Sequence, residues 1–93
     1  MKKFHATISS PQKVIFDGEI ESLTVPATGG DIQVLAEHMP LVSVLEAGEI
    51  IYILEKDEEK LKIAHGVVEV KGDKRVIVLV VLDEDEEDKV PKN

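Results

Sequence analysis

The 93-residue sequence contains no cysteine and no tryptophan. Without cysteine it cannot form a disulfide scaffold, a thiolate zinc site or a cysteine nucleophile, and it suits a reducing compartment such as the cytoplasm. It has three aromatic residues, Phe4, Phe16 and Tyr52, and its 19 acidic residues against 11 basic ones give a net charge of −8. Nucleic-acid binding depends on positive charge and aromatic stacking, so we expect no nucleic-acid partner.

Long apolar segments are also missing. The longest run, Val76 to Leu82, has seven residues, whereas a membrane-spanning helix needs about 20. The basic start Met1-Lys2-Lys3 resembles the opening of a signal peptide, but polar residues interrupt the apolar segment that would have to follow. We therefore expect a mature N-terminus and a chain that does not cross a membrane.

The negative charge is concentrated at one end of the chain. Residues 83–88 are six consecutive acids, while residues 1–82 contain 13 acidic and 9 basic residues, a net charge of −4. With 43% hydrophobic residues overall, the chain has enough apolar material for one globular domain of this length. We expect a folded domain over residues 1–82 and an acidic, disordered tail over residues 83–93.

Apolar and polar residues alternate from Lys3 to Ser9, as in a half-buried strand. No segment of ten or more residues shows helical apolar spacing, and turn signals recur every 8 to 12 residues or so. The pattern predicts an all-β fold of two packed antiparallel sheets, with a hairpin turn at Asp17-Gly18. It also predicts a strand from Glu19 to Val25 with a bulge near Glu21 and Ser22, and a charged hairpin tip at Lys56 to Lys60.

The run Val76 to Leu82 is typical of a strand buried on both faces, because the residues that would point to either face of the sheet are all apolar. Its β-branched residues favour a strand over a buried helix.

Candidate catalytic and metal-binding residues are sparse. His5, His38 and His65 show no metal-ligand spacing, and His5 falls in the polar phase of its strand, where a solvated side chain is expected. Gly29-Gly30-Asp31 lacks the helix start and the Lys-Ser/Thr pair of a phosphate-binding loop. The serines lie in no nucleophile motif. The residues alone indicate an acidic, soluble β-sandwich without catalytic apparatus, cofactor or metal.

A series of short motifs in register nevertheless resembles one family, the N-terminal domain of the epsilon subunit of F-type ATP synthase. The resemblance covers about residues 3–82. The motifs are Ser10-Pro11, Phe16-Asp17-Gly18, Val25-Pro26, Gly30-Asp31-Ile32-Gln33-Val34-Leu35, His38-Met39-Pro40-Leu41, Leu45, Gly48 and Gly66-Val67-Val68-Glu69-Val70.

The resemblance implies a ten-stranded β-sandwich and a non-catalytic rotor subunit of the central stalk. Such a subunit is clamped to the gamma subunit, rests on the polar loops of the c-ring and couples proton translocation to rotary ATP synthesis. It is peripheral to the cytoplasmic side of the bacterial plasma membrane.

Two groups of contact residues follow from the resemblance. Thr28, Gly30, Asp31 and Ile32 match the loop that faces the c-ring, where Asp31 would meet a basic residue; alternatively, Asp31 only stabilises its turn. The gamma-facing group is Ser10, His38, Met39 and Pro40. Met39 suits an adaptable apolar contact, whereas His38 could equally be an ordinary turn residue.

The sequence also departs from the family. The family commonly has glycine where Gln33 stands and Gly-Gly-Phe where His65-Gly66-Val67 stand. Most bacterial members continue into a two-helix domain that inhibits ATP hydrolysis and in some cases binds ATP. This sequence has an acidic segment there, so we expect no ATP binding by the chain, whether it is a naturally short member or part of a longer one.

Two other classes remain open at this point. A lipoyl or biotinyl carrier domain is also a small acidic sandwich, and its modified lysine at a hairpin tip could correspond to Lys74, after Asp73. A ligand-binding adhesion sandwich is the other, although it usually has aromatic binding residues.

Overall fold

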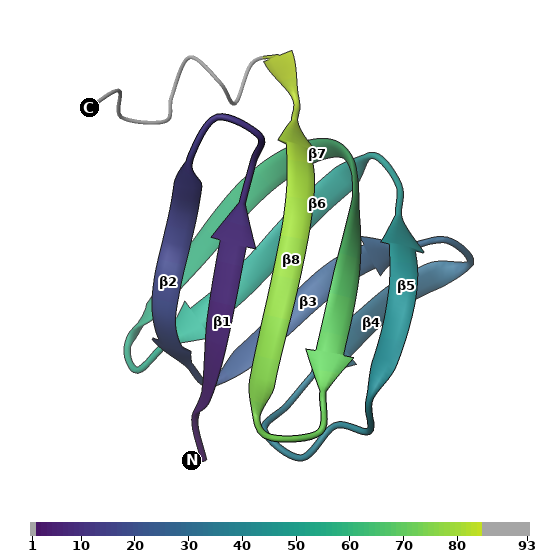
Figure 1. The fold of residues 1–93 in the computed structure, drawn as a ribbon. Helices are drawn as coiled ribbons and strands as arrows, with labels where there is room; N and C mark the ends of the chain where they lie inside the picture. The colour runs from purple at the N-terminus through teal and green to yellow at the C-terminus, as the bar shows by residue number, and fades with distance from the viewer. Residues whose placement is uncertain (1, 85–93) are drawn as a thin grey trace.

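The computed structural model describes residues 2–84 and confirms an all-β fold (Figure 1). It contains eight strands, not the ten that the family resemblance implied. Part of the difference lies in β7, which runs without a break for 15 residues. The strands are β1 (Phe4–Ser9), β2 (Val14–Ile20), β3 (Ser22–Ala27), β4 (Gly30–Val34), β5 (Leu41–Leu45), β6 (Gly48–Leu54), β7 (Asp57–Lys71) and β8 (Arg75–Leu82).

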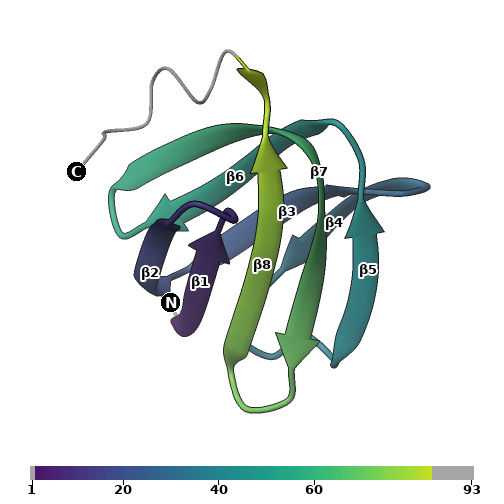
Figure 2. The ribbon, with the colours of Figure 1, turned by 45° about the horizontal axis from the view of Figure 1, so that its top comes forward.

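The strands form two layers that share β7. Its first half pairs with β6, and its second half pairs with β5 and β8. The first layer has the order β2-β1-β8-β7-β5, and the second contains β4, β3, β6 and the start of β7. In Figures 1 and 2 the first layer lies in front, and β7 bends from one layer into the other. The β1–β8 pair is parallel, and the remaining pairs are antiparallel.

The predicted hairpin turn at Asp17-Gly18 is wrong, because both residues lie inside β2, where they pair with Thr7 and Ala6. Gly18 occurs there for a packing reason: a Cβ at this position would lie 3.2 Å from Cζ of the Phe16 ring. The predicted strand from Glu19 to Val25 does not contain a bulge but consists of the end of β2 and the start of β3. It breaks at Glu21, where the chain passes from the first layer to the second.

The core lies between the layers and is made by alternate residues of most strands, whereas β3 is buried over nearly its whole length. Phe4, Ile8, Ile20, Leu23 and Leu45 are among its largest fully buried side chains, and each stabilises the fold by about 1.5 to 3 kcal/mol through burial. The two layers also meet through aromatic rings. The Phe16 and Tyr52 centroids are 4.9 Å apart with the rings tilted by 45°, a favourable aromatic geometry.

The expectation that Val76 to Leu82 is buried on both faces is wrong for this chain by itself. Val76, Val78, Val80 and Leu82 face the core, but Leu79 and Val81 are exposed on the other side. Because the β8 neighbours β1 and β7 lie in the same layer, nothing in residues 2–84 covers that side of the strand.

The expected hairpin tip after β6 is present, although the turn itself comprises only Glu55 and Lys56. Most of the expected acidic tail, from residue 85 on, lies outside the described residues. Within residues 2–84 no helix has the length and apolar character needed to span a membrane.

Candidate partner-binding surfaces

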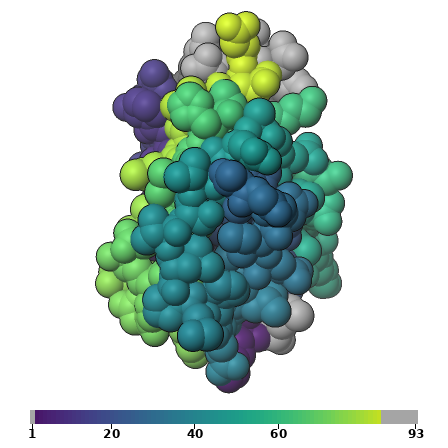
Figure 3. All heavy atoms as spheres, turned by 90° about the vertical axis from the view of Figure 1, so that its right-hand side faces the viewer, coloured from purple at the N-terminus to yellow at the C-terminus, as the bar shows by residue number. Residues whose placement is uncertain are grey.

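The first predicted contact group forms the tip of the β3–β4 hairpin. Ala27 pairs with Gly30, so Thr28 and Gly29 make a two-residue turn. Gly29 and Gly30 have φ angles of 93° and 136°, which L-residues with a side chain rarely adopt. The glycine pair therefore sets the shape of this hairpin, which projects from the flank shown in Figure 3.

The hairpin tip is fastened to β5 and exposes the Asp31 side chain. The Thr28 backbone N–H donates to the Val44 carbonyl at 3.1 Å, and its hydroxyl donates to the same oxygen at 3.4 Å. Asp31 and Gly30 are exposed, and Ile32 is half-buried against the core. Among residues 2–84 Asp31 forms no ion pair, so its carboxylate is available to a partner.

Ser10, from the second predicted group, acts as a turn residue between β1 and β2. Its backbone N–H donates to the Lys13 carbonyl at 2.8 Å. Its hydroxyl donates to the same carbonyl and accepts from the Lys13 N–H, both at 3.3 Å. The Ser10 hydroxyl therefore already has hydrogen-bond partners within the chain. A partner protein would contact Ser10 as part of the turn at the end of β1.

His38, Met39 and Pro40 shape the connection between β4 and β5. His38 Nδ1 donates to the Met39 carbonyl at 2.7 Å, so the histidine orders the turn. Pro40 lies against Gly72 in the β7–β8 turn, where a Cβ would be 3.3 Å from its Cγ. Met39 projects freely, with 78% of its surface exposed.

The structure does not bring Ser10 and the His38–Pro40 turn together. Ser10 follows Ser9, which pairs with Leu79 near the far end of β8, whereas Pro40 packs beside the turn that leads into Arg75. The four residue steps from Arg75 to Leu79 alone span roughly 13 Å. The two predicted contacts therefore lie toward opposite ends of one layer.

Between them the outer face of the first layer carries large exposed apolar side chains. We call this group the apolar surface: Val42, Val44, Val67, Leu79 and Val81. Val44 pairs with Val67, and Val67 with Leu79, so the apolar row crosses the three adjacent strands β5, β7 and β8 and ends at Ser9 of β1, which pairs with Leu79. On β5 the usual polarity is reversed, because Val42 and Val44 are exposed while Ser43 is half-buried on the alternate side.

A hollow of about 620 Å³ opens on the apolar surface beside the β1–β2 turn. Gly66 explains the close strand packing beneath it, because a Cβ there would lie 2.4 Å from the Leu79 carbonyl oxygen. The hollow is lined mainly by apolar groups and can accept an apolar side chain. Its lining comprises Ser9, Ser10, Pro11, Val44, His65, Gly66, Val67, Leu79, Val80 and Val81.

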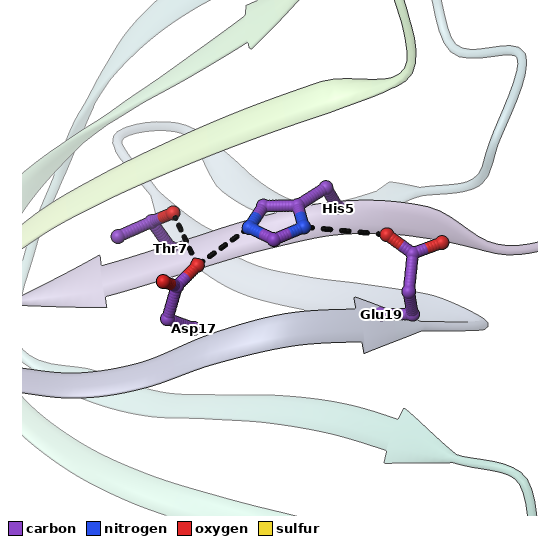
Figure 4. A network of polar contacts seen from close by, with 4 residues as sticks. All are labelled: His5, Thr7, Asp17 and Glu19. Carbon is purple, nitrogen blue, oxygen red and sulfur yellow. Dashed lines mark hydrogen bonds and ion pairs between the residues drawn. The ribbon is translucent and has the colours of Figure 1, made fainter.

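The other end of the same outer face is charged. Arg75 pairs with Asp73 at 2.9 Å (Nη2 to Oδ2), and this contact lowers the pKa of Asp73 and raises that of Arg75. On β1, the His5 ring lies between Asp17 and Glu19 of β2 (Figure 4). The hydrogen bond to Asp17 is the main reason that the pKa of His5 is raised and that of Asp17 lowered. No group of three or more histidines and acids in residues 2–84 could hold a metal ion.

Residues 3–82 match the family described as the ATP synthase delta/epsilon chain, beta-sandwich domain. The match spans nearly all of the sandwich. The chain belongs to this family. The family match does not support the carrier-domain or adhesion alternatives, although Lys74 does lie in the β7–β8 turn.

Two curated relatives show the extent of the similarity. The ATP synthase epsilon chain of Chlorobaculum tepidum is 37% identical over 78 residues, which cover 83% of this chain and 89% of the relative. The epsilon chain of Sulfurimonas denitrificans is 47% identical over 81 residues, 86% of this chain but only 62% of the relative. The match thus extends over most of one relative and somewhat over half of the other.

Solved structures share the sandwich fold at low sequence identity. A chain of the Euglena gracilis mitochondrial ATP synthase superposes with a TM-score of 0.81 at 20% identity and covers 94% of this chain and 60% of its own length. A chain from the Tetrahymena thermophila central stalk and c-ring structure gives 0.73 at 15% identity and covers 86% of this chain and 64% of that one.

The apolar surface is the feature that the sequence analysis missed. The signal was present, because Val76 to Leu82 and Val67-Val68 place apolar residues in both phases of a strand. An antiparallel sheet with one wet face would show alternation there. The missing alternation was interpreted as burial within the domain, whereas the structure shows an uncovered face.

Proposed function

We propose that this epsilon-type chain works in the central stalk of an F-type ATP synthase, where it binds the gamma subunit and the c-ring and transmits torque between them. In this role the chain itself catalyses no reaction and binds no ATP. It lies at the cytoplasmic side of a bacterial plasma membrane and is peripheral to it through the complex.

The observation that carries this proposal is the apolar surface. An exposed apolar area extending over three strands is characteristic of a protein interface, since it is unfavourable in water. Val42 and Val44 are 71% and 61% exposed, so their burial by a partner would be the main gain in free energy. Gamma is the partner we assign to this face, because Ser10 and the His38–Pro40 turn, which resemble the family's gamma contacts, border it on two sides.

The β3–β4 hairpin is the proposed c-ring contact. Its tip is held in place by the hydrogen bond from the Thr28 backbone N–H to the Val44 carbonyl of β5. The exposed Asp31 carboxylate next to the tip can pair with a basic side chain of a polar loop. Such a pair is worth about 0.2 to 1 kcal/mol while it stays exposed and sets orientation more than affinity.

Affinity capture from the native membrane tests the proposal. A tagged full-length chain should recover gamma and the c-ring subunit, both identified by mass spectrometry. The Leu79→Glu variant should lose gamma, because it places a carboxylate in the centre of the apolar surface, whereas Gln33→Glu adds the same charge to the second layer and should retain it. Recovery of neither subunit by the native chain would refute the proposal.

A further inference from the structure

The strand β2 is an edge strand of the sheet. It ends the strand order of the first layer, and its backbone ladder in the described part of the chain is with β1. The register of that ladder shifts between Ile8 and Ser9, so the pairing is irregular toward the turn. Side-chain contacts that bridge β1 and β2 therefore add to the backbone ladder and to the core packing of Ile20 in holding β2 in place.

Four side chains make such a bridge at the other end of the ladder. His5 Nε2 lies 2.5 Å from Asp17 Oδ1, and His5 Nδ1 lies 3.3 Å from Glu19 Oε2. The Thr7 hydroxyl donates to Asp17 Oδ1 at 3.2 Å. Figure 4 shows the imidazole lying lengthwise between the two carboxylates, with one ring nitrogen facing each.

This geometry requires a particular protonation state of the ring. Ionised carboxylates can only accept hydrogen bonds, and a neutral imidazole has one N–H donor and one lone pair. Only the imidazolium, with two N–H donors, satisfies both carboxylates at once. If the ring loses a proton, one nitrogen lone pair faces a carboxylate oxygen, and that side of the bridge becomes repulsive.

The remaining charged groups near His5 leave this bridge intact. Opposite His5 on β8, Arg75 is engaged with Asp73, and the Lys74 carbonyl accepts the His5 backbone N–H at 3.0 Å. On β1 itself, the Lys3 ammonium pairs with Glu55 at 2.7 Å and interacts more weakly with the charges of Glu21 and Glu19. The two carboxylates that contact the ring thus dominate its surroundings.

We infer that His5, Asp17 and Glu19 form a proton-controlled clasp that fastens β2 to β1. The clasp is closed while the imidazole carries two protons, and it is half-released when one proton leaves. The raised pKa of His5, caused first by its hydrogen bond to Asp17, agrees with this assignment. The clasp is a property of the chain alone and does not depend on the proposed partners.

Nuclear magnetic resonance of the ¹⁵N-labelled full chain tests the clasp. Ring nitrogen shifts of His5, followed from acidic to alkaline pH, should show both nitrogens protonated below a titration midpoint that lies above that of free histidine. Asp17→Asn and Glu19→Gln should each lower the midpoint, whereas Glu58→Gln, which removes an exposed carboxylate from β7, should not. Amide exchange in β2, corrected for its intrinsic pH dependence, should accelerate as His5 deprotonates.

Two results would overturn the inference. One is a His5 midpoint at or below that of free histidine. The other is a midpoint that neither Asp17→Asn nor Glu19→Gln changes in a folded chain, as judged by the dispersion of its amide spectrum. Because no partner is present in these measurements, their outcome is separate from that of the capture experiment.

Discussion

Val67 of β7 lies directly opposite Leu79 of β8, and the two side chains are 38% and 55% exposed on the outer face of the first layer. A cross-strand apolar pair stabilises a sheet when a second layer covers it. Here the pair continues into Val44 on one side, and no described residue covers the row. The same row thus marks the face on which the described part of the sandwich leaves apolar side chains uncovered.

The difference in burial between the core side and the outer side of the sheet can be measured by shortening one leucine side chain on each side to alanine. Leu23 is fully buried, so Leu23→Ala should lower the free energy of unfolding by about 2 to 5 kcal/mol. Leu79→Ala removes the same atoms from the exposed side and should cost less than about 1 kcal/mol. Urea denaturation monitored by circular dichroism gives both values, and equal losses would mean that Leu79 is buried in the free chain.

Gly66 should tolerate no side chain. A Cβ there would lie 2.4 Å from the Leu79 carbonyl oxygen, and this backbone contact cannot relax without distorting the β7–β8 ladder. Gly66→Ala is expected to destabilise the chain by about 1 to 3 kcal/mol or more. Gly18→Ala is the matched control, because its Cβ would meet only the tip of the Phe16 ring at 3.2 Å. Thermal unfolding that ranks Gly18→Ala as the more damaging change would contradict this reading.

Charge reversal at Asp31 should weaken the c-ring contact without affecting the fold. The side chain is exposed on the β3–β4 hairpin, so Asp31→Lys should leave the unfolding transition unchanged. Retention of the c-ring on the purified stalk should decrease at moderate salt, because a favourable pair becomes a repulsion. Asp57→Lys, next to the β6–β7 turn, provides the control for charge alone. Equal retention by the two variants would limit Asp31 to a role in its own turn.

Stability should depend on pH through His5. Its pKa is raised above the ordinary 6.5 by the bond to Asp17, so its contribution is fully present below about pH 6.5 and is lost as pH rises through the folded-state value. The urea midpoint should therefore fall on that rise in the native chain and in His65→Gln, but less in His5→Gln. A native chain whose pH profile matches that of His5→Gln would exclude this contribution.

Asp17 acts in the opposite direction on acidification. Its pKa is lowered from 3.8, first by the bond to His5, so its contribution is present above that pH and disappears as pH falls through the folded value. Asp17→Asn should consequently flatten the acid side of the stability profile. Urea midpoints of the native chain and of Asp17→Asn, measured at a series of pH values below 7, check this prediction. The same loss of stability on acidification in both chains would contradict it.

The sequence was sufficient for the fold class and for the strands with regular alternation. In β1, Phe4, Ala6 and Ile8 are buried as their spacing predicts. The predicted turn at Asp17-Gly18 failed because a glycine has two common uses. A turn uses its backbone freedom, whereas here Gly18 makes room for the Phe16 ring, and that contact depends on tertiary packing. The count of ten strands, which the family resemblance implied, is too high for this chain, in part because β7 continues through a bend between layers.

The candidate contacts were predictable only as separate segments. Short motifs identified the β3–β4 hairpin, Ser10 and the His38–Pro40 turn, but nothing in the sequence states that the last two lie toward opposite ends of one layer. The apolar surface emerges only when the registers of β5, β7 and β8 align Val44, Val67 and Leu79. Pairing register depends on the whole fold, so residues distant in sequence could not be assigned to one surface beforehand.

The central claim, that the apolar surface binds gamma, is tested most directly by isothermal titration of the purified chain with the gamma subunit of the same synthase. The native chain and Gln33→Glu should bind with one-to-one stoichiometry and a negative heat-capacity change, the mark of apolar burial. Leu79→Glu should lose affinity by at least about tenfold, equivalent to about 1.4 kcal/mol, while remaining folded. No binding by the native chain, or equal binding by Leu79→Glu, would contradict the account.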